Sequence, residues 1–189
     1  MSHLPIGYFE RVYRDNPDPW GFASRWYEAR KYALTVAALP RQRYVRAFEP
    51  GCSIGVLTEQ LAARCDALIA GELVPAVADH ARARLAGQPH VEVRALAIPE
   101  DWPDGRFDLI VLSEVAYYLT LDGLHALLAR IDACLDPGGH VIAVHWTGET
   151  DYPLRGDAAH AVLDAHRAWH RIAQYREPSF VLAVYERHP

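Results

Sequence analysis

Short apolar runs alternate with segments of helical periodicity from Tyr44 to the end of the chain, and this alternation is the strongest constraint on the fold. The runs cover residues 44–49, 66–72, 90–96, 107–112 and 140–146. Between them, the segments 56–65, 75–87 and 121–135 carry apolar residues three and four positions apart. Strands that alternate with helices are typical of a parallel sheet wrapped by helices, so we predict an α/β fold.

The two ends of the chain depart from this alternation. Residues 167–177 and 179–187 read as two strands separated by Pro178, which predicts a hairpin at the sheet edge and seven strands in all. Before Tyr44, a proline-rich turn leads into an amphipathic helix. Its aromatic residues are too many for a solvent-exposed helix and must cover something apolar; they are Trp20, Phe22, Trp26, Tyr27 and Tyr32. We therefore expect residues 1–43 to form a helical arm or lid on a core made of residues 44–189, within one structural domain.

Composition excludes several classes of partner. The net charge is -5, and the basic residues are 18 arginines and a single lysine, Lys31, without a basic stripe. This disfavours nucleic acid and anionic membranes as partners. The N-terminal residues lack a basic region followed by an apolar core, and no apolar stretch is long enough to span a bilayer. We therefore expect a soluble cytoplasmic protein.

Metal binding is also disfavoured. The three cysteines are far apart and form no CxxC pair. His166 and His170 are four residues apart but lack a carboxylate partner between them.

Two glycines mark a ligand site after the first apolar run. Gly51 and Gly55 stand in FEPGCSIG, where a strand enters a helix, and they let the backbone approach a ligand while the first helical amides stay free. Glu72 ends the second run, 17 residues after Gly55, where an acid can accept hydrogen bonds from ribose hydroxyls. The alternative for the two glycines is a tight turn without a ligand, and the alternative for Glu72 is an unrelated surface glutamate.

The glycine spacing separates two kinds of nucleotide cofactor. A dinucleotide turn would read GxGxxG, whereas this chain has GxxxG preceded by the acid Glu49. A carboxylate is a poor neighbour for pyrophosphate and suits a cationic ligand better.

These features together resemble the class I S-adenosylmethionine-dependent methyltransferases. The family pattern of an acid-x-G-x-x-x-G turn, a second-strand acid and an LxPGG turn is present as EPGCSIG, Glu72 and LDPGG at 135–139. The resemblance extends from about Tyr44 to the end and implies a Rossmann-like fold: a seven-stranded, mostly parallel sheet, helices on both faces and a terminal antiparallel hairpin. It also implies S-adenosyl-L-methionine as the cofactor.

The resemblance narrows to the nodulation protein S-like branch. DPWGFASRWYEARKY, FDLIVLSEVAYYL and AVHW are similar to segments of that branch. This implies an enzyme that transfers a methyl group to a small-molecule acceptor, most simply an amine, by in-line displacement at the sulfonium methyl.

The resemblance also assigns roles to residues. Arg30 would grip the cofactor carboxylate while Glu49 faces its amino group. The third strand lacks the usual adenine-binding acid, so backbone groups around Ala97 and Ile98 would take that role. The implied cofactor contacts are Trp20, Arg30, Glu49, Gly51, Cys52, Gly55, Glu72, Leu73, Ala97, Ile98, Ser113 and Glu114.

Two residues are candidates for chemistry. Glu114 could accept a proton from an ammonium acceptor, or could only orient the cofactor or the arm. His145 could be a base or a substrate contact, or a hydrogen-bonded structural histidine. Tyr117 and Tyr118 are adjacent, so we expect at most one to face the substrate. Rival functions are a non-catalytic cofactor-binding protein and a dinucleotide-dependent oxidoreductase, and the oligomeric state stays open.

Overall fold

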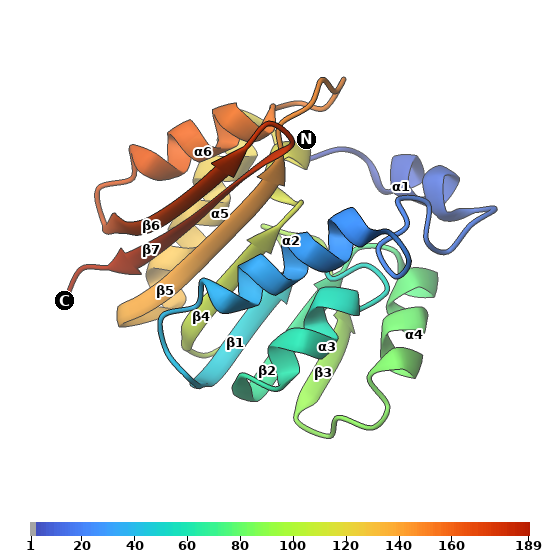
Figure 1. Cartoon of the computed structure of the whole chain (residues 1–189), viewed down its shortest axis with the longest axis horizontal. Helices are drawn as coiled ribbons and strands as arrows, with labels where there is room; N and C mark the ends of the chain where they lie inside the picture. Colours follow the sequence, from blue (N-terminus) through green and yellow to red (C-terminus); the bar gives the residue numbers. More distant parts are fainter. Residues whose placement is uncertain (1–2) are drawn as a thin grey trace.

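The computed structural model describes residues 3–189, so the first two residues of the predicted arm lie outside the described part (Figure 1). The strands are β1 (Tyr44–Pro50), β2 (Cys65–Glu72), β3 (Val91–Ala95), β4 (Phe107–Ser113), β5 (Leu135–Trp146), β6 (Trp169–Glu177) and β7 (Phe180–Arg187). The helices are α1 (Ile6–Tyr13), α2 (Trp26–Ala37), α3 (Val56–Ala62), α4 (Pro75–Arg84), α5 (Leu121–Cys134) and α6 (Gly156–Asp164), with a short 3₁₀ turn η1 (Ala116–Tyr118).

The seven strands form one sheet in the order β3-β2-β1-β4-β5-β7-β6. β1 pairs in parallel with β2 and β4, and β3 and β5 continue the parallel pairing on either side. β7 runs antiparallel to β5 and β6 closes the edge as its hairpin partner. The predicted seven-stranded, mostly parallel sheet with a terminal antiparallel hairpin is confirmed.

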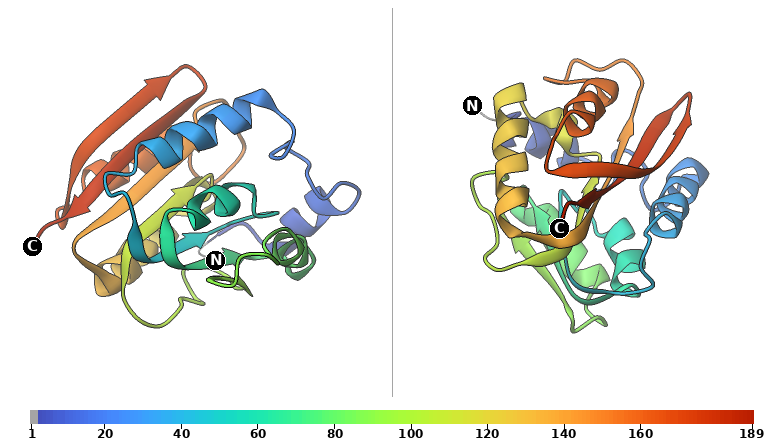
Figure 2. Two further views of the ribbon diagram at one scale, coloured as in Figure 1. Left: turned by 60° about the horizontal axis from the view of Figure 1, so that its bottom comes forward. Right: turned by 90° about the vertical axis from the view of Figure 1, so that its left-hand side faces the viewer.

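Helices cover both faces of this sheet. α2 and α3 lie on one face, and α5 and α6 lie on the other (Figure 2). β4 is buried along nearly its whole length because it lies in the middle of the sheet between these two layers. This explains why its sequence is a continuous apolar run and does not alternate.

Three local features differ from the sequence prediction. Helices α1 and α6 were not predicted. The segment 135–139 was predicted as a turn but forms the irregular start of β5, where the pairing with β4 shifts register after Phe107. Gly138 accommodates this irregularity with a φ of 70°.

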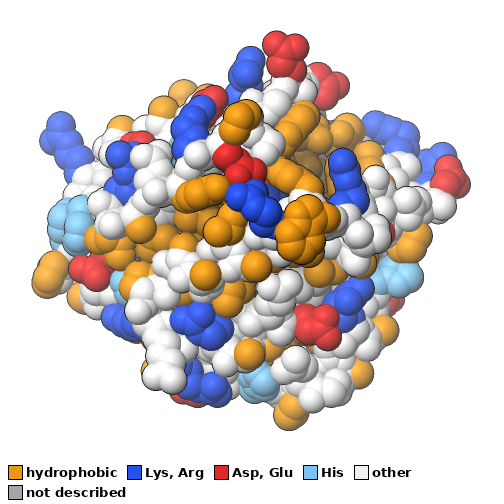
Figure 3. Space-filling model, viewed as in Figure 1, with side chains coloured by type: hydrophobic (Ala, Val, Ile, Leu, Met, Phe, Trp, Pro, Cys, Tyr) orange, Lys and Arg blue, Asp and Glu red, His pale blue; other side chains and the backbone are white. Residues whose placement is uncertain are grey.

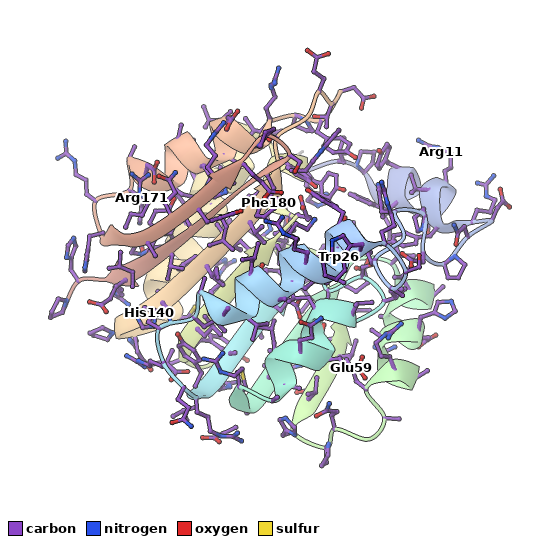
Figure 4. All side chains as sticks on the ribbon, viewed as in Figure 1. Arg11, Trp26, Glu59, His140, Arg171 and Phe180 are labelled. Atoms are coloured by element: carbon purple, nitrogen blue, oxygen red, sulfur yellow. The ribbon has the colours of Figure 1, made fainter. Side chains whose placement is uncertain are left out.

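The arm places α2 along the sheet with its first turn at the end towards which the parallel strands point (Figure 1). Trp26 on α2 and Arg11 on α1 lie towards this end, whereas His140 at the start of β5 lies at the other (Figure 4). Trp26 is 78% exposed, so the prediction that it covers an apolar surface is wrong. Its ring points outward because the neighbouring Tyr27 and Glu28 occupy the inward face of the helix.

The visible surface mixes both signs of charge, and hydrophobic side chains gather around the start of α2 (Figure 3). Within residues 3–189, no helix has the length and apolar character needed to cross a membrane.

Candidate active site

A cavity of about 490 Å³ lies at the carboxyl ends of the parallel strands, where ligands bind in open α/β sheets. Its walls come from the arm, the turn between β1 and α3, the carboxyl ends of the parallel strands with the segments that follow them, the loop before α6 and the turn between β6 and β7. Of the predicted cofactor contacts, nine line it: Trp20, Glu49, Gly51, Cys52, Glu72, Leu73, Ile98, Ser113 and Glu114.

The glycine turn shapes the floor of this cavity. Gly51 has a φ of 76°, and a Cβ added there would lie 3.1 Å from Val115 Cγ2. Gly55 has a φ of 79° but does not line the cavity; a Cβ there would meet Leu85 and Ala81 at 3.2 and 3.3 Å. Gly55 starts α3 and lets it pack closely on α4, and its contact with the cofactor stays a prediction.

Glu49 brings an unsatisfied negative charge to the cavity wall. The residue is 2% exposed, and its Oε2 has no hydrogen-bond partner within residues 3–189. Burial raises the pKa of Glu49 to about 7. A buried carboxylate without a donor costs free energy unless a cation or hydrogen-bond donor meets it. The site therefore suits a ligand that carries an ammonium group.

Glu72 is held by backbone amides at the end of β2. Its two carboxylate oxygens accept hydrogen bonds from Ser53 N at 3.0 Å and Val74 N at 2.9 Å. Burial raises the pKa of Glu72, and these two amides oppose the rise. Each oxygen retains a second lone pair, so the carboxylate can still accept hydroxyl donors from a ligand.

Cys52 is a wall residue without reactive character. Burial raises the pKa of its thiol well above the ordinary value, so the thiol stays protonated at neutral pH.

The region after β3 differs from the prediction at one position. Leu96 and Ile98 line the cavity, whereas Ala97 does not. Ala97 N donates to Asp101 Oδ2 at 3.1 Å, and Ala97 O accepts from Asp101 N at 2.6 Å. A local turn already uses both backbone groups of Ala97, so its contact with adenine stays a prediction that the structure does not favour.

Arg30 lies on the outer side of α2. Its Nη1 donates to both carboxylate oxygens of Glu177, at 3.0 and 2.8 Å, and its Nη2 donates to Tyr175 Oη at 2.9 Å. Hydrogen bonding to Glu177 raises the pKa of Arg30. The side chain joins α2 to β6 and does not line the cavity, so its contact with the cofactor stays a prediction.

Glu114 lies in the cavity but already holds several donors. Its Oε1 accepts from Lys31 Nζ, and its Oε2 accepts from Tyr117 Oη at 2.6 Å and from Trp146 N at 2.9 Å. Its φ of 54° is unusual for a residue other than glycine. This conformation turns the chain sharply after β4 and directs the carboxylate toward the arm. Both Tyr117 and Tyr118 line the cavity, and the expectation that at most one faces the substrate stays a prediction.

His145 is fully buried behind the cavity wall. Its Nε2 accepts a hydrogen bond from Ala116 N at 3.0 Å, so the ring proton is on Nδ1, which donates to His160 Nε2 at 3.1 Å. Burial lowers the pKa of His145 well below its ordinary value and that of His160 to about 4. The ring of His145 holds the η1 turn and does not line the cavity, which favours the alternative of a hydrogen-bonded structural histidine.

Several wall residues were missed by sequence reasoning. Arg25, Glu28 and Lys31 from the arm line the cavity, as do Tyr13, Ser53 and Tyr152. Tyr13 Oη and Ser53 Oγ are 2.6 Å apart and join α1 to the glycine turn. Two features of the sequence could have indicated the wall residues on the arm. One helical face carries Tyr27, Glu28, Lys31 and Tyr32 at suitable spacing, and Lys31 is the single lysine of the chain. Within the described residues, no metal-binding cluster of histidine, cysteine or acids is found.

The family model of nodulation protein S (NodS) matches residues 10–147, which include most of the arm, the glycine turn and β4. This chain belongs to the NodS family. Nodulation protein S from Rhizobium tropici is 30% identical over 127 residues, which are 66% of this chain and 53% of that relative. The chain therefore spans about half the length of that NodS protein.

Solved structures agree with the fold of this NodS family member. A candidate methyltransferase from Pseudomonas syringae is 44% identical, with a TM-score of 0.78 over 86% of this chain and 100% of that chain. The N-methyltransferase NodS from Bradyrhizobium japonicum WM9, in complex with S-adenosyl-L-homocysteine, is 23% identical, with a TM-score of 0.84 over 96% of this chain and 97% of that chain. The fold is that of the class I methyltransferases.

Proposed function

We propose that this NodS family member is an S-adenosylmethionine-dependent methyltransferase that methylates an amine on a small molecule. The observation that carries the proposal is the buried Glu49 carboxylate, whose Oε2 lacks a partner within residues 3–189 and faces a cavity behind a glycine turn. Family membership and the similarity to the N-methyltransferase NodS from Bradyrhizobium japonicum support the same activity.

The wall residues fit the parts of this cofactor. Glu49 would meet the ammonium group of the methionine portion, and Glu72 would accept the ribose hydroxyls. Leu73, Leu96 and Ile98 supply an apolar wall for the adenine ring. Arg25 is the arginine on the cavity wall and would pair with the carboxylate. When bound, the cofactor supplies a methyl group on a sulfonium centre.

The protein would promote methyl transfer mainly by holding the acceptor and the cofactor in position. An ammonium must lose a proton before its nitrogen lone pair can attack, and buried carboxylates on the arm side of the cavity can hold that proton. Aromatic walls from the arm and η1 exclude water and fix the acceptor nitrogen against the methyl group. A small-molecule acceptor fits a cavity of this size.

Calorimetric titration with S-adenosylmethionine, S-adenosylhomocysteine and NAD tests the cofactor. We expect both adenosyl ligands to bind and NAD not to bind. A turnover screen then follows formation of S-adenosylhomocysteine with amine, hydroxyl and carboxyl acceptors. NAD binding without adenosyl binding would favour an oxidoreductase, and adenosyl binding without turnover would favour a non-catalytic binding protein.

A further inference from the structure

Two carboxylates and one ammonium meet on the arm side of the cavity. Glu28 and Lys31 come from α2, and Glu114 comes from the turn after β4. All three line the cavity, and Glu28 and Lys31 are 5% and 1% exposed. With both acids ionised the group carries one net negative charge in a largely desolvated place.

Lys31 is directed at Glu114. Its Nζ donates a hydrogen bond to Glu114 Oε1 and lies 4.9 Å from the centre of the Tyr27 ring. Glu28 Oε2 is 2.9 Å from Nζ, but this contact lacks hydrogen-bond geometry. Burial alone would lower the pKa of Lys31, yet the two carboxylates outweigh it and the pKa is raised. Lys31 therefore stays charged and is matched mainly by Glu114.

Glu114 has little remaining capacity for a ligand. Lys31 binds one of its oxygens, and Tyr117 and the Trp146 amide bind the other. These donors fix the carboxylate and join the arm to the end of β4. Glu114 is thus a positioning residue that anchors Lys31.

Glu28 is the less completely bonded of the two acids. Its Oε2 accepts no hydrogen bond of good geometry within residues 3–189, and its one close polar neighbour is Lys31 Nζ at 2.9 Å, which Glu114 shares. Burial raises the pKa of Glu28, against the opposing effect of Lys31. Tyr27, Tyr32, Tyr117 and Trp146 supply aromatic wall around this corner. A carboxylate oxygen beside aromatic rings is complementary to an organic ammonium group.

We propose that Glu28 is the residue that binds the amino group of the methyl acceptor and selects amines over alcohols and acids. This inference rests on the proposed function. An ammonium offers several N–H donors and the missing positive charge, an alcohol offers one donor and no charge, and a carboxylate is repelled. Lys31 and Glu114 hold the position of Glu28 without contacting the acceptor nitrogen.

The test uses calorimetry on the full chain saturated with S-adenosylhomocysteine at pH 7.5. The probes are ethanolamine and benzylamine, each compared with its hydroxyl counterpart, ethylene glycol or benzyl alcohol. We expect at least one amine to bind tenfold or more tightly than its counterpart. Glu28→Gln should lose about tenfold in amine affinity and keep its S-adenosylhomocysteine affinity within about twofold.

Glu10→Gln is the matched control, because Glu10 is an exposed glutamate of the arm. It should bind every probe as the wild type does. Glu28→Asp keeps the charge on a shorter side chain and should bind the amines more tightly than Glu28→Gln. This comparison distinguishes the loss of a charged contact from a loss of folded protein. Thermal denaturation of each variant checks that it is folded.

Three results would overturn the proposal: no amine preference in the wild type, unchanged amine affinity in Glu28→Gln, or an equal loss of amine and S-adenosylhomocysteine affinity in that variant. If the wild type fails to bind S-adenosylhomocysteine, the proposed function fails and this inference fails with it. If it binds that ligand without preferring amines, only the acceptor assignment fails.

Discussion

At the scale of single residues, the cavity is built from groups that would be unfavourable without a ligand. Glu49 and Glu28 each bury a carboxylate oxygen that accepts no hydrogen bond within residues 3–189, and Glu28 shares Lys31 with Glu114. Gly51 keeps a left-handed backbone where a side chain would approach Val115. Such features lower the stability of the free protein and are typical of sites that gain their missing partners on binding.

Replacement of Glu49 by glutamine should change the stability of the protein and its affinity for the cofactor in opposite directions. The pKa of Glu49 is raised from 4.5 to about 7 in the folded chain, so the folded state holds a proton that the unfolded state releases between these pH values. The free energy of unfolding therefore falls as pH rises through this window, by about 3 kcal/mol for this group. Glu49→Gln should lose this dependence and be more stable at pH 8 in urea unfolding, yet bind S-adenosylmethionine more weakly.

A reduced stability of Glu49→Gln at pH 8, or unchanged cofactor affinity, would contradict the role given to this carboxylate. The wild type should also bind S-adenosylmethionine less tightly below pH 7, because the protonated acid cannot pair with an ammonium.

Gly51→Ala should harm both the turn and the site. Alanine at a φ of 76° costs about 1–2 kcal/mol, and its Cβ would press on Val115 at 3.1 Å. We expect a loss of that size in the free energy of unfolding and at least a tenfold loss of S-adenosylhomocysteine affinity by calorimetry. Gly87→Ala is the control, because a Cβ there meets nothing within 4 Å. Equal losses of ligand affinity in Gly51→Ala and Gly87→Ala would show that Gly51 does not contact the ligand.

At the scale of elements, α2 presents different chemistry on its two sides. Glu28 and Lys31 face the cavity, whereas Arg30 pairs with Glu177 on β6. Arg25, just before the helix, is the arginine on the wall, and its Nη1 lies 3.4 Å from the Trp20 carbonyl oxygen. The helix thus joins the sheet edge to the ligand site.

The two arginines should respond differently to substitution. Arg25→Ala should weaken S-adenosylmethionine binding about three- to tenfold, because a charge-assisted contact at a partly exposed site is lost. The same Arg25→Ala variant should lose little affinity for decarboxylated S-adenosylmethionine, which has no carboxylate to pair with Arg25. Arg30→Ala should change the affinity for neither ligand in the same titrations. The reverse pattern would mean that Arg30 leaves Glu177 when the cofactor binds.

At the scale of the whole molecule, the two helices of the arm are attached to the core to different extents. α2 buries Glu28, Lys31, Tyr32 and Thr35, whereas α1, within the described residues, has no buried residue. The contacts of α1 include the hydrogen bond between Tyr13 and Ser53 and an edge contact between the Phe9 and Tyr118 rings at 4.9 Å. Trp20 stacks on Phe22 at 5.4 Å over the cavity. Segments with little buried apolar contact open at low free-energy cost. We therefore propose that residues 1–43 act as a lid on the core formed by residues 44–189.

Limited proteolysis should report the state of this lid. Cleavage near residues 17–22 should slow at least fivefold when S-adenosylhomocysteine is added, because the ligand provides the arm with a surface to pack on. Cleavage near Gly87, an exposed site outside the cavity wall, should not change and serves as the control. Equal rates near residues 17–22 with and without ligand would show that the arm stays in one position.

The sequence by itself determined the order of the strands and of helices α2 to α5, the edge hairpin and the acid beside a glycine turn. These follow from local rules: apolar spacing distinguishes strand from helix, and glycine permits a positive φ whatever the surrounding fold. Glu49, Gly51 and Glu72 reached the cavity as predicted because parallel strands bring their carboxyl ends to one edge.

Only the tertiary structure decided which neighbouring residue faces the ligand. Arg30 and Lys31 are adjacent, but successive residues on a helix differ by about 100°, so one pairs with β6 and the other lines the cavity. His145 and Trp146 are adjacent in a strand and point to opposite faces, which directs His145 to His160 and Trp146 to the cavity. Sequence periodicity places such residues on an element, but long-range packing of the arm and sheet sets the face that each one meets.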